Sequence, residues 1–177
     1  MLWVNLRRGL IVSAVFFVLL GLAYPLAETG IGQALFSHQA NGSLSRNGSA
    51  LIGQQWKGPQ WFQGRPDSDD PTATGGSNLG PRSKDLVALY QKRVAALKKE
   101  GITPTPDLVA ASGSGVDPDI SPAAAYAQVD AVAAARRLTA DQVHALVAAH
   151  VHGPQWGFLG ASYVDVLELN EALAALS

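Results

Sequence analysis

The chain contains no cysteine among its 177 residues. This absence excludes a disulfide framework, a thiolate metal site and a cysteine nucleophile, although it does not identify the compartment. Charge of one sign does not accumulate either, because 13 basic residues stand against 14 acidic ones without forming blocks. There is therefore no electrostatic reason to expect a nucleic-acid partner. No G-x-S-x-G nucleophile elbow occurs, so the commonest serine hydrolase pattern is missing as well.

The histidines do not indicate a catalytic or metal site either. His144, His150 and His152 lie on or just after one predicted helix, and imidazolium near a helix C-terminus is favoured by the helix dipole. A metal site built from His150 and His152 would need further ligands that the sequence does not indicate. We therefore expect no catalytic residues and no bound metal. A carboxylate pair stays open, so a membrane-tethered extracytoplasmic hydrolase or binding protein acting alone is the alternative function.

The N-terminus carries the one long hydrophobic run. Residues 9–26 contain no charge, close to the roughly 20 residues that a helix needs to cross the hydrocarbon core. Arg7 and Arg8 precede the run, and Glu28 is the first charge after it. The positive-inside tendency predicts a cytoplasmic N-terminus at 1–8, a transmembrane helix at 9–27 and an extracytoplasmic remainder. A cleaved signal peptide is the rival interpretation, since Gly21 and Ala23 have the spacing of a cleavage site; it also exports the remainder.

The exported part is predicted to be α+β. A membrane-proximal segment and linker at 28–48 precedes one extracytoplasmic domain at 49–177, with three to four helices and a few short strands. Periodicity and capping residues predict helices at Thr29–Phe36, at Lys84–Glu100 after a Ser83 cap, at Ala123–Arg137 after a Ser121 cap, from the Thr139 and Gln142 capping box to about His150, and at Asn170–Leu176. Short strands are expected at Ser49–Ile52, Leu108–Ala111 and Tyr163–Leu167.

Two further stretches stand out between these elements. Trp56, Trp61 and Phe62 lie among glycine and proline residues, and such aromatics usually pack beneath a loop. Residues 64–82 then show no helical or strand period, and a loop of that length in a compact domain is usually functional or disordered.

The segment ASGSGVDPDISP at 111–122 poses the main chemical question. Ser112, Gly113, Ser114 and Gly115 begin like a phosphate-binding loop and precede a helix. However, the third glycine and a following Gly-Lys-Ser/Thr are missing, and Asp117 and Asp119 would repel phosphate. A calcium loop lacks its spacing and its terminal glutamate. The third interpretation is a tight turn whose glycines permit positive φ before the helix that Ser121 caps.

Taken in order behind one span, several segments resemble a known family. They are Gly64-Arg65-Pro66, Gly75-Gly76-Ser77-Asn78 within 74–79, the 111–118 motif with Asp117-Pro118, Ile120 to Pro122, and Val164 to Asn170. This combination is similar to the C subunit of the bacterial Kdp-type potassium-transporting ATPase, over essentially the whole chain. It departs from the family pattern at Asp67-Ser68, Asp119 and Asp165.

The resemblance implies a non-catalytic, single-pass subunit of the bacterial inner membrane. Its implied partners are a channel-like potassium-binding subunit, a P-type ATPase subunit that hydrolyses ATP, a small peptide subunit, and the lipid bilayer. The implied roles are assembly of a high-affinity potassium uptake pump, a higher ATP affinity of the ATPase subunit, or control of potassium entry. No cofactor is expected to bind tightly, and ATP would act through the complex. Direct ATP binding would use the four residues 112–115 and Gln128, yet the two arginines place that loop on the side without ATP.

Overall fold

A computed structural model describes residues 1–67, 70, 72 and 74–176, and Ser68 of the family comparison lies outside this range. The chain divides into two compact units, Met1–Leu44 and Ser45–Ser177.

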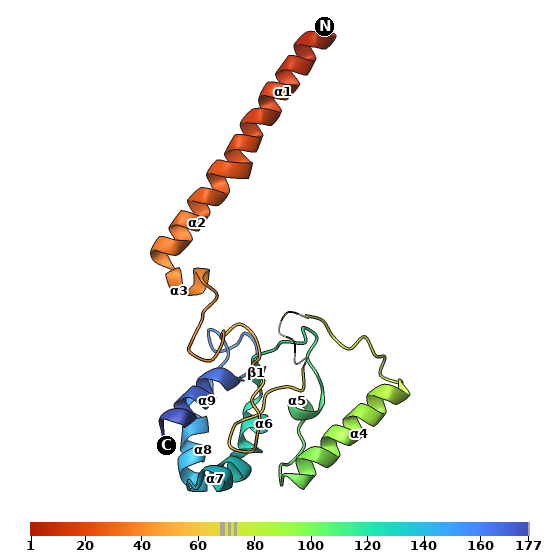
Figure 1. The fold of residues 1–177 in the computed structure, drawn as a ribbon, viewed down its shortest axis with the longest axis vertical. Coiled ribbons are helices and arrows are strands. Elements are labelled where there is room, and N and C mark those ends of the chain that lie inside the picture. The colour runs from red at the N-terminus through yellow and green to blue at the C-terminus, as the bar shows by residue number, and fades with distance from the viewer. Residues whose placement is uncertain (68–69, 71, 73, 177) are drawn as a thin grey trace. The chain divides into compact units, whose positions relative to one another are not determined.

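The first unit is helical (Figure 1). Helix α1 (Leu2–Val18) continues through the wider π-helical turn η1 (Leu19–Ala23) into α2 (Tyr24–Leu35), and the short α3 (Ser37–Ala40) follows. The helix over Leu2–Leu35 is long and apolar enough to cross a membrane, and none of its span is buried in protein. The helical continuation expected at Thr29–Phe36 is confirmed as far as Leu35.

The second unit contains six helices and two strands in its described part, where three to four helices were expected. The elements are α4 (Lys84–Lys99), α5 (Pro106–Val109), β1 (Asp119–Ile120), α6 (Pro122–Tyr126), α7 (Val129–Arg136), α8 (Ala140–Ala149), β2 (Val164–Asp165) and α9 (Val166–Ala175). Strands β1 and β2 pair antiparallel, with Asp119 opposite Asp165 and Ile120 opposite Val164. Mostly helices with one small sheet agree with the α+β class.

The capping residues position the helices as the sequence predicts. The Ser83 hydroxyl accepts from the Leu86 N–H at the start of α4, and Ser121 accepts from Ala124 at the start of α6. Thr139 and Gln142 form the reciprocal capping box of α8. Each cap satisfies a backbone N–H that has no partner within its own helix.

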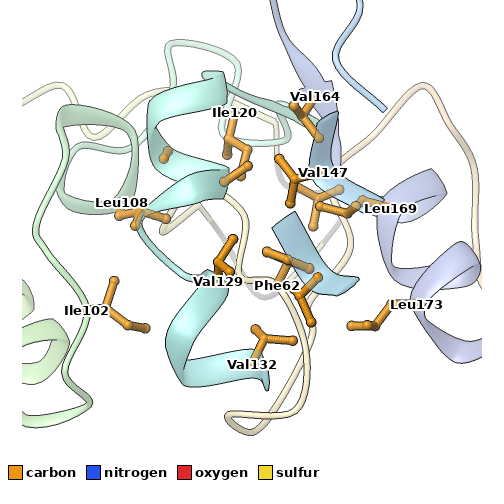
Figure 2. Close-up of a cluster of buried hydrophobic side chains, with 14 of the residues drawn as sticks. Phe62, Ile102, Leu108, Ile120, Val129, Val132, Val147, Val164, Leu169 and Leu173 are labelled. Atoms are coloured by element: carbon orange, nitrogen blue, oxygen red, sulfur yellow. The ribbon is translucent and has the colours of Figure 1, made fainter. Parts of the chain in front are cut away.

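The core lies between α6, α7, α8 and α9 and surrounds an extended segment that carries Phe62. Figure 2 shows Phe62 among valine and leucine side chains from the helices, and it is fully buried. Trp56 and Trp61 pack partly buried against this cluster, and the Arg136 guanidinium lies 4.2 Å from the centre of the Trp61 ring. The expectation that these aromatics pack beneath a loop agrees with this arrangement.

Two predicted strands are wrong. Ser49–Ile52 forms a turn closed by the Ile52 N–H on the Ser49 carbonyl. Leu108–Ala111 overlaps the helical turn α5, which Pro106 starts because its fixed φ suits the first helical position. Leu108 is buried as expected, so burial was predicted correctly and backbone conformation was not.

Two helix predictions need different boundaries. The helix predicted at Ala123–Arg137 breaks into α6 and α7 at Gln128. The Gln128 side-chain amide donates to the Ala124 carbonyl, and the Gln128 backbone N–H donates to the Ala125 carbonyl. The last helix begins at Val166 rather than at Asn170, because the Asp165 carboxylate accepts from Glu168 and caps it. The strand predicted at Tyr163–Leu167 is correspondingly limited to Val164–Asp165.

Candidate functional site

Arg65 joins three segments of the second unit that are distant in the sequence. Its Nη2 lies 2.8 Å from Asp107 Oδ1, and its Nε lies 2.9 Å from Asp117 Oδ2. The guanidinium thereby connects the 64–67 turn, helix α5 and the Ser-Gly loop, defined here as residues 112–118. The Nε contact with Asp117 lacks hydrogen-bond geometry, so the guanidinium joins these segments by charge rather than by bond direction.

Asp67 fills the interior of the Ser-Gly loop. Its Oδ1 accepts from the Ser112 N–H at 2.6 Å, and its Oδ2 accepts from the Ser112 hydroxyl at 2.6 Å and from the Asp117 N–H at 3.0 Å. Backbone N–H groups that converge on a negative charge are the device by which loops of this kind hold phosphate. Here the anion is a carboxylate of the chain itself.

Two further N–H groups of the Ser-Gly loop are also bonded within the loop, and one of its carbonyls is bonded to a neighbouring segment. The Gly115 N–H donates to the Ser112 hydroxyl at 2.8 Å, and the Val116 N–H donates to the Ser114 hydroxyl at 3.2 Å. The Ser114 carbonyl accepts from the Gly75 N–H at 2.6 Å, which places the Gly75-Gly76 pair directly against the loop. The geometry therefore favours the tight-turn interpretation over a phosphate or calcium loop.

The other residues predicted for the site do not form one cluster: some contribute backbone carbonyls, some are exposed on a loop and two are buried in the core. Pro66 and Pro118 contribute carbonyls, which accept from Arg93 and from the Val166 N–H. Ser77 and Asn78 are exposed on the loop before α4. Gln128 and Asn170 are instead buried in the core, with exposed fractions of 1% and 0%. The hydrogen bonds of these two side-chain amides run to residues 62, 63 and 124 rather than to the Ser-Gly loop.

Two residues of this cluster were missed by sequence reasoning. Arg93 of α4 donates at 2.9 Å to both the Val109 and the Pro66 carbonyls. Arg93 lies on the same helical face as Tyr90 and Leu97. A charged residue within an otherwise apolar stripe is therefore the sequence feature from which its structural role could have been predicted. Asp107 accepts from the Ser121 N–H at 2.8 Å. Burial alone would raise the pKa of Asp107, but the bonds from Ser121 and the charge of Arg65 outweigh it, and the pKa is lowered.

A second group of carboxylates meets on the small sheet. Asp119 and Asp165 stand opposite each other in the antiparallel pair, so their side chains emerge on the same face. Burial, with the neighbouring charges of Asp165 and Asp117, raises the pKa of Asp119 to about 6. Burial also raises the pKa of Asp165, against backbone hydrogen bonds that lower it. His152, 3.2 Å from Glu168, provides the nearby imidazole.

The raised pKa of Asp119 predicts how the stability of the wild type relative to an Asp119→Asn variant depends on pH. Because folding raises the pKa of Asp119, its protonation stabilises the fold fully below the unfolded value of 3.8, and this contribution is lost as pH rises through about 6. The free energy of unfolding of the wild type relative to the variant should therefore fall across that window, on the order of 1 kcal/mol after solvent screening. Denaturant unfolding over a pH series measures it; a constant difference between the two proteins would contradict the assignment.

The histidines have structural contacts. His144 stacks on Tyr126 with ring centres 4.6 Å apart, and a ring nitrogen of His150 lies 2.8 Å from the Leu146 carbonyl. Among the residues that the structure describes, no group of three or more histidine, aspartate or glutamate side chains is arranged to hold a metal ion.

The second unit is an α+β domain whose segments are joined by internal ion pairs. In the sequence it follows a helix that is long and apolar enough to span a membrane. The family model for the c chain of the K⁺-transporting ATPase, KdpC, matches residues 6–175. The chain belongs to this family, and is thus a subunit of a potassium-transporting ATPase.

Individual relatives agree along nearly the whole length. The potassium-transporting ATPase KdpC subunit of Caulobacter vibrioides is 48% identical over 183 residues, covering 97% of this chain and 93% of that protein. The KdpC subunits of Burkholderia vietnamiensis and Paraburkholderia phytofirmans are 48% and 49% identical over 184 residues, with 96% of this chain covered. They cover 95% and 96% of those two proteins.

Proposed function

We propose that the chain is a non-catalytic accessory subunit of a high-affinity potassium uptake pump, needed for assembly and for the ATP affinity of a P-type ATPase partner. ATP hydrolysis belongs to that partner in this proposal. The observation that supports the proposal is the Ser-Gly loop, in which four N–H groups donate to Asp67 or to the loop's own hydroxyls. A loop that already encloses a carboxylate has committed four of its N–H groups, and the enclosed negative charge repels a nucleotide phosphate.

The surface of the second unit also supports a role in a complex. The turn at 153–160 presents Trp156 and Phe158, 83% and 74% exposed. No charged residue occurs between Gly153 and Tyr163. Exposed aromatics on a turn held by the Gln155 and Leu159 bridge are typical anchors of a protein interface. We propose that this turn contacts the channel-like potassium-binding subunit, and that the small peptide subunit completes the complex.

The expected kinetic result concerns a pump purified with and without this chain. Where the other subunits still assemble, omission of the chain should raise the KM for ATP several-fold while potassium-stimulated hydrolysis persists. Where they do not assemble, the chain acts at the assembly step. The full-length chain alone, titrated calorimetrically with ATP in detergent, should show no saturable heat. An unchanged KM in a fully assembled remainder, or tight binding by the isolated chain, would contradict the proposal.

The orientation is the second part of the proposal. Arg7 and Arg8 before the span support a cytoplasmic N-terminus in a bacterial inner-membrane protein, with the second unit outside. Because the chain has no native cysteine, single cysteines report cleanly. Ala148→Cys, at an exposed position of α8, should react with an impermeant maleimide in intact cells, and Asn5→Cys only after lysis. The reverse pattern would invert the topology, and loss of the Asn5→Cys site from the mature chain would indicate a cleaved signal peptide.

A further inference from the structure

The apolar helix of the first unit changes its hydrogen-bonding pattern at one place. Over η1 the turns widen, and the Tyr24 N–H donates to the carbonyl of Leu19, five residues earlier. Pro25 follows immediately and has no N–H to donate. π-helical turns of this kind interrupt α-helices as local bulges and are often found at functional sites.

Counting donors shows which carbonyl loses its partner. In a regular α-helix the Leu20 carbonyl would accept from the Tyr24 N–H, which here goes to Leu19. In a continued π-helix it would accept from residue 25, which is proline. Neither register supplies a backbone donor to Leu20 O, which is therefore an unpaired acceptor beside the side-chain-free Gly21.

The surroundings of this acceptor make the missing bond costly. Leu20 lies six residues before Leu26, the end of the uncharged run, so its carbonyl sits about 9 Å inside that boundary at 1.5 Å per residue. Backbone groups in hydrocarbon have no water to bond, and each unsatisfied group there is expensive. Neighbouring helices are one of the means by which membrane proteins satisfy carbonyls freed by proline.

The first unit does not provide the donor itself. All of its residues are described, and the side-chain-to-backbone bond of the span runs from the Thr29 hydroxyl to the Pro25 carbonyl at 2.8 Å. Within one turn of Leu20 the side chains are apolar apart from Tyr24, and the nearest preceding hydroxyl, Ser13, is two turns away.

We propose that the Leu20 carbonyl is a docking point for a polar side chain, a hydroxyl or amide donor, on a transmembrane helix of a partner subunit. Gly21 adds no side chain beside this carbonyl, the ring of Phe17 lies 3.5 Å from where a Cβ would stand, and the partner helix gains a fixed register by docking beside that ring. Small residues and interhelical hydrogen bonds are the two means by which helices associate in lipid. The inference rests on the proposed function, because it requires a membrane-embedded partner.

Carbonyl NMR in the assembled complex tests the proposal. Labelling with ¹³C-carbonyl leucine and ¹⁵N-glycine selects Leu20 through its bond to Gly21, together with the Leu79–Gly80 and Leu159–Gly160 pairs in the second unit. The converse labelling selects Gly9 through Leu10, in regular α1, with Gly21 through Leu22. The Leu20 carbonyl signal should move to higher frequency when the wild-type chain in lipid is assembled into the pump, and Gly9 should not move. A Leu20 signal that is unchanged on assembly would overturn the proposal.

A variant gives an independent readout. Pro25→Ala restores an N–H that can return to the freed carbonyls, so the partner's donor loses its site. We expect about fivefold lower retention of the chain in the complex under detergent challenge, the effect of one interhelical hydrogen bond. Leu26→Val, which leaves the backbone donors unchanged, is the matched control. Equal retention of the two variants overturns this docking point. If the wild-type chain itself recovers no partner subunits, the proposed function fails instead.

Discussion

Replacing Asn170 with leucine is expected to lower the free energy of unfolding of the second unit by about 3–4 kcal/mol. Asn170 is fully buried, and its side-chain amide accepts from the Phe62 N–H and donates to the Phe62 carbonyl, both at 2.9 Å. Leucine keeps the volume but leaves both backbone groups without a partner in the core. The cost of the substitution is therefore the desolvation of two unmet polar groups rather than a cavity.

The measurement is equilibrium denaturation of the full-length chain in detergent, followed by tryptophan fluorescence. Gln91→Leu is the matched control, because it makes the same change from amide to leucine on an exposed face of α4. We expect Gln91→Leu to change stability within about 0.5 kcal/mol, as surface substitutions usually do. Equal unfolding midpoints for the two variants would show that the Asn170 contacts contribute little.

A neighbouring pair explains why Asn170 matters to the fold. Gln128 accepts from the Gln63 N–H at 2.8 Å and donates to the Gln63 carbonyl at 3.0 Å, repeating on the next residue what Asn170 does for Phe62. The Arg136 Nε donates to the Gln60 carbonyl at 2.8 Å. Side chains from the helices thus take the place of a neighbouring strand, and they hold an extended segment within a helical core. From sequence Gln128 is a candidate ATP contact, whereas in the structure its side chain holds the backbone of the extended segment at Gln63.

The elements that sequence predicted well are those governed by local rules. The α4 helix is recognisable because its apolar residues recur at helical spacing and Ser83 caps it, and α8 because its capping box spans only four residues. Each signal is contained in a few consecutive positions, so tertiary contacts do not have to be known.

The parts that sequence missed depend on long-range partners. Asn170 and Phe62 are 108 positions apart, and Gln128 and Gln63 are 65 apart. No local pattern shows that an amide will complete the backbone of so distant a segment. The break of the 123–137 helix at Gln128 has the same origin, since the side chain that caps the break also binds Gln63. Tertiary contacts here override the helix propensity of an alanine-rich run.

Three residues that we expected to depart from the family pattern have prominent contacts in this structure. Asp67 supplies the carboxylate inside the Ser-Gly loop, and Asp119 and Asp165 face each other across β1 and β2. The acid at 67 meets three donors of the Ser-Gly loop, which a nonpolar residue would leave unmet.

The Ser-Gly loop leads to the second large prediction, that Gly115→Ala destabilises the second unit by about 3 kcal/mol. Gly115 has φ +73°, where a Cβ is strained, and a Cβ added there would lie 2.5 Å from the Gly75 carbonyl oxygen. The clash is with backbone, so a side-chain rotation cannot relieve it. To accommodate alanine, the Gly75-Gly76 segment would have to move away and lose its 2.6 Å bond to the Ser114 carbonyl.

Gly113→Ala is the control for this prediction, because it lies in the same loop with no atom within 4 Å of an added Cβ and no positive φ. We expect it to leave the thermal unfolding midpoint nearly unchanged. The two substitutions also separate the interpretations of the loop. A structural turn predicts that Gly115→Ala loses stability and pump assembly together, while Gly113→Ala keeps both. A nucleotide loop would instead let Gly115→Ala fold and assemble normally but raise the KM for ATP, and that outcome would return the motif to the phosphate-binding class.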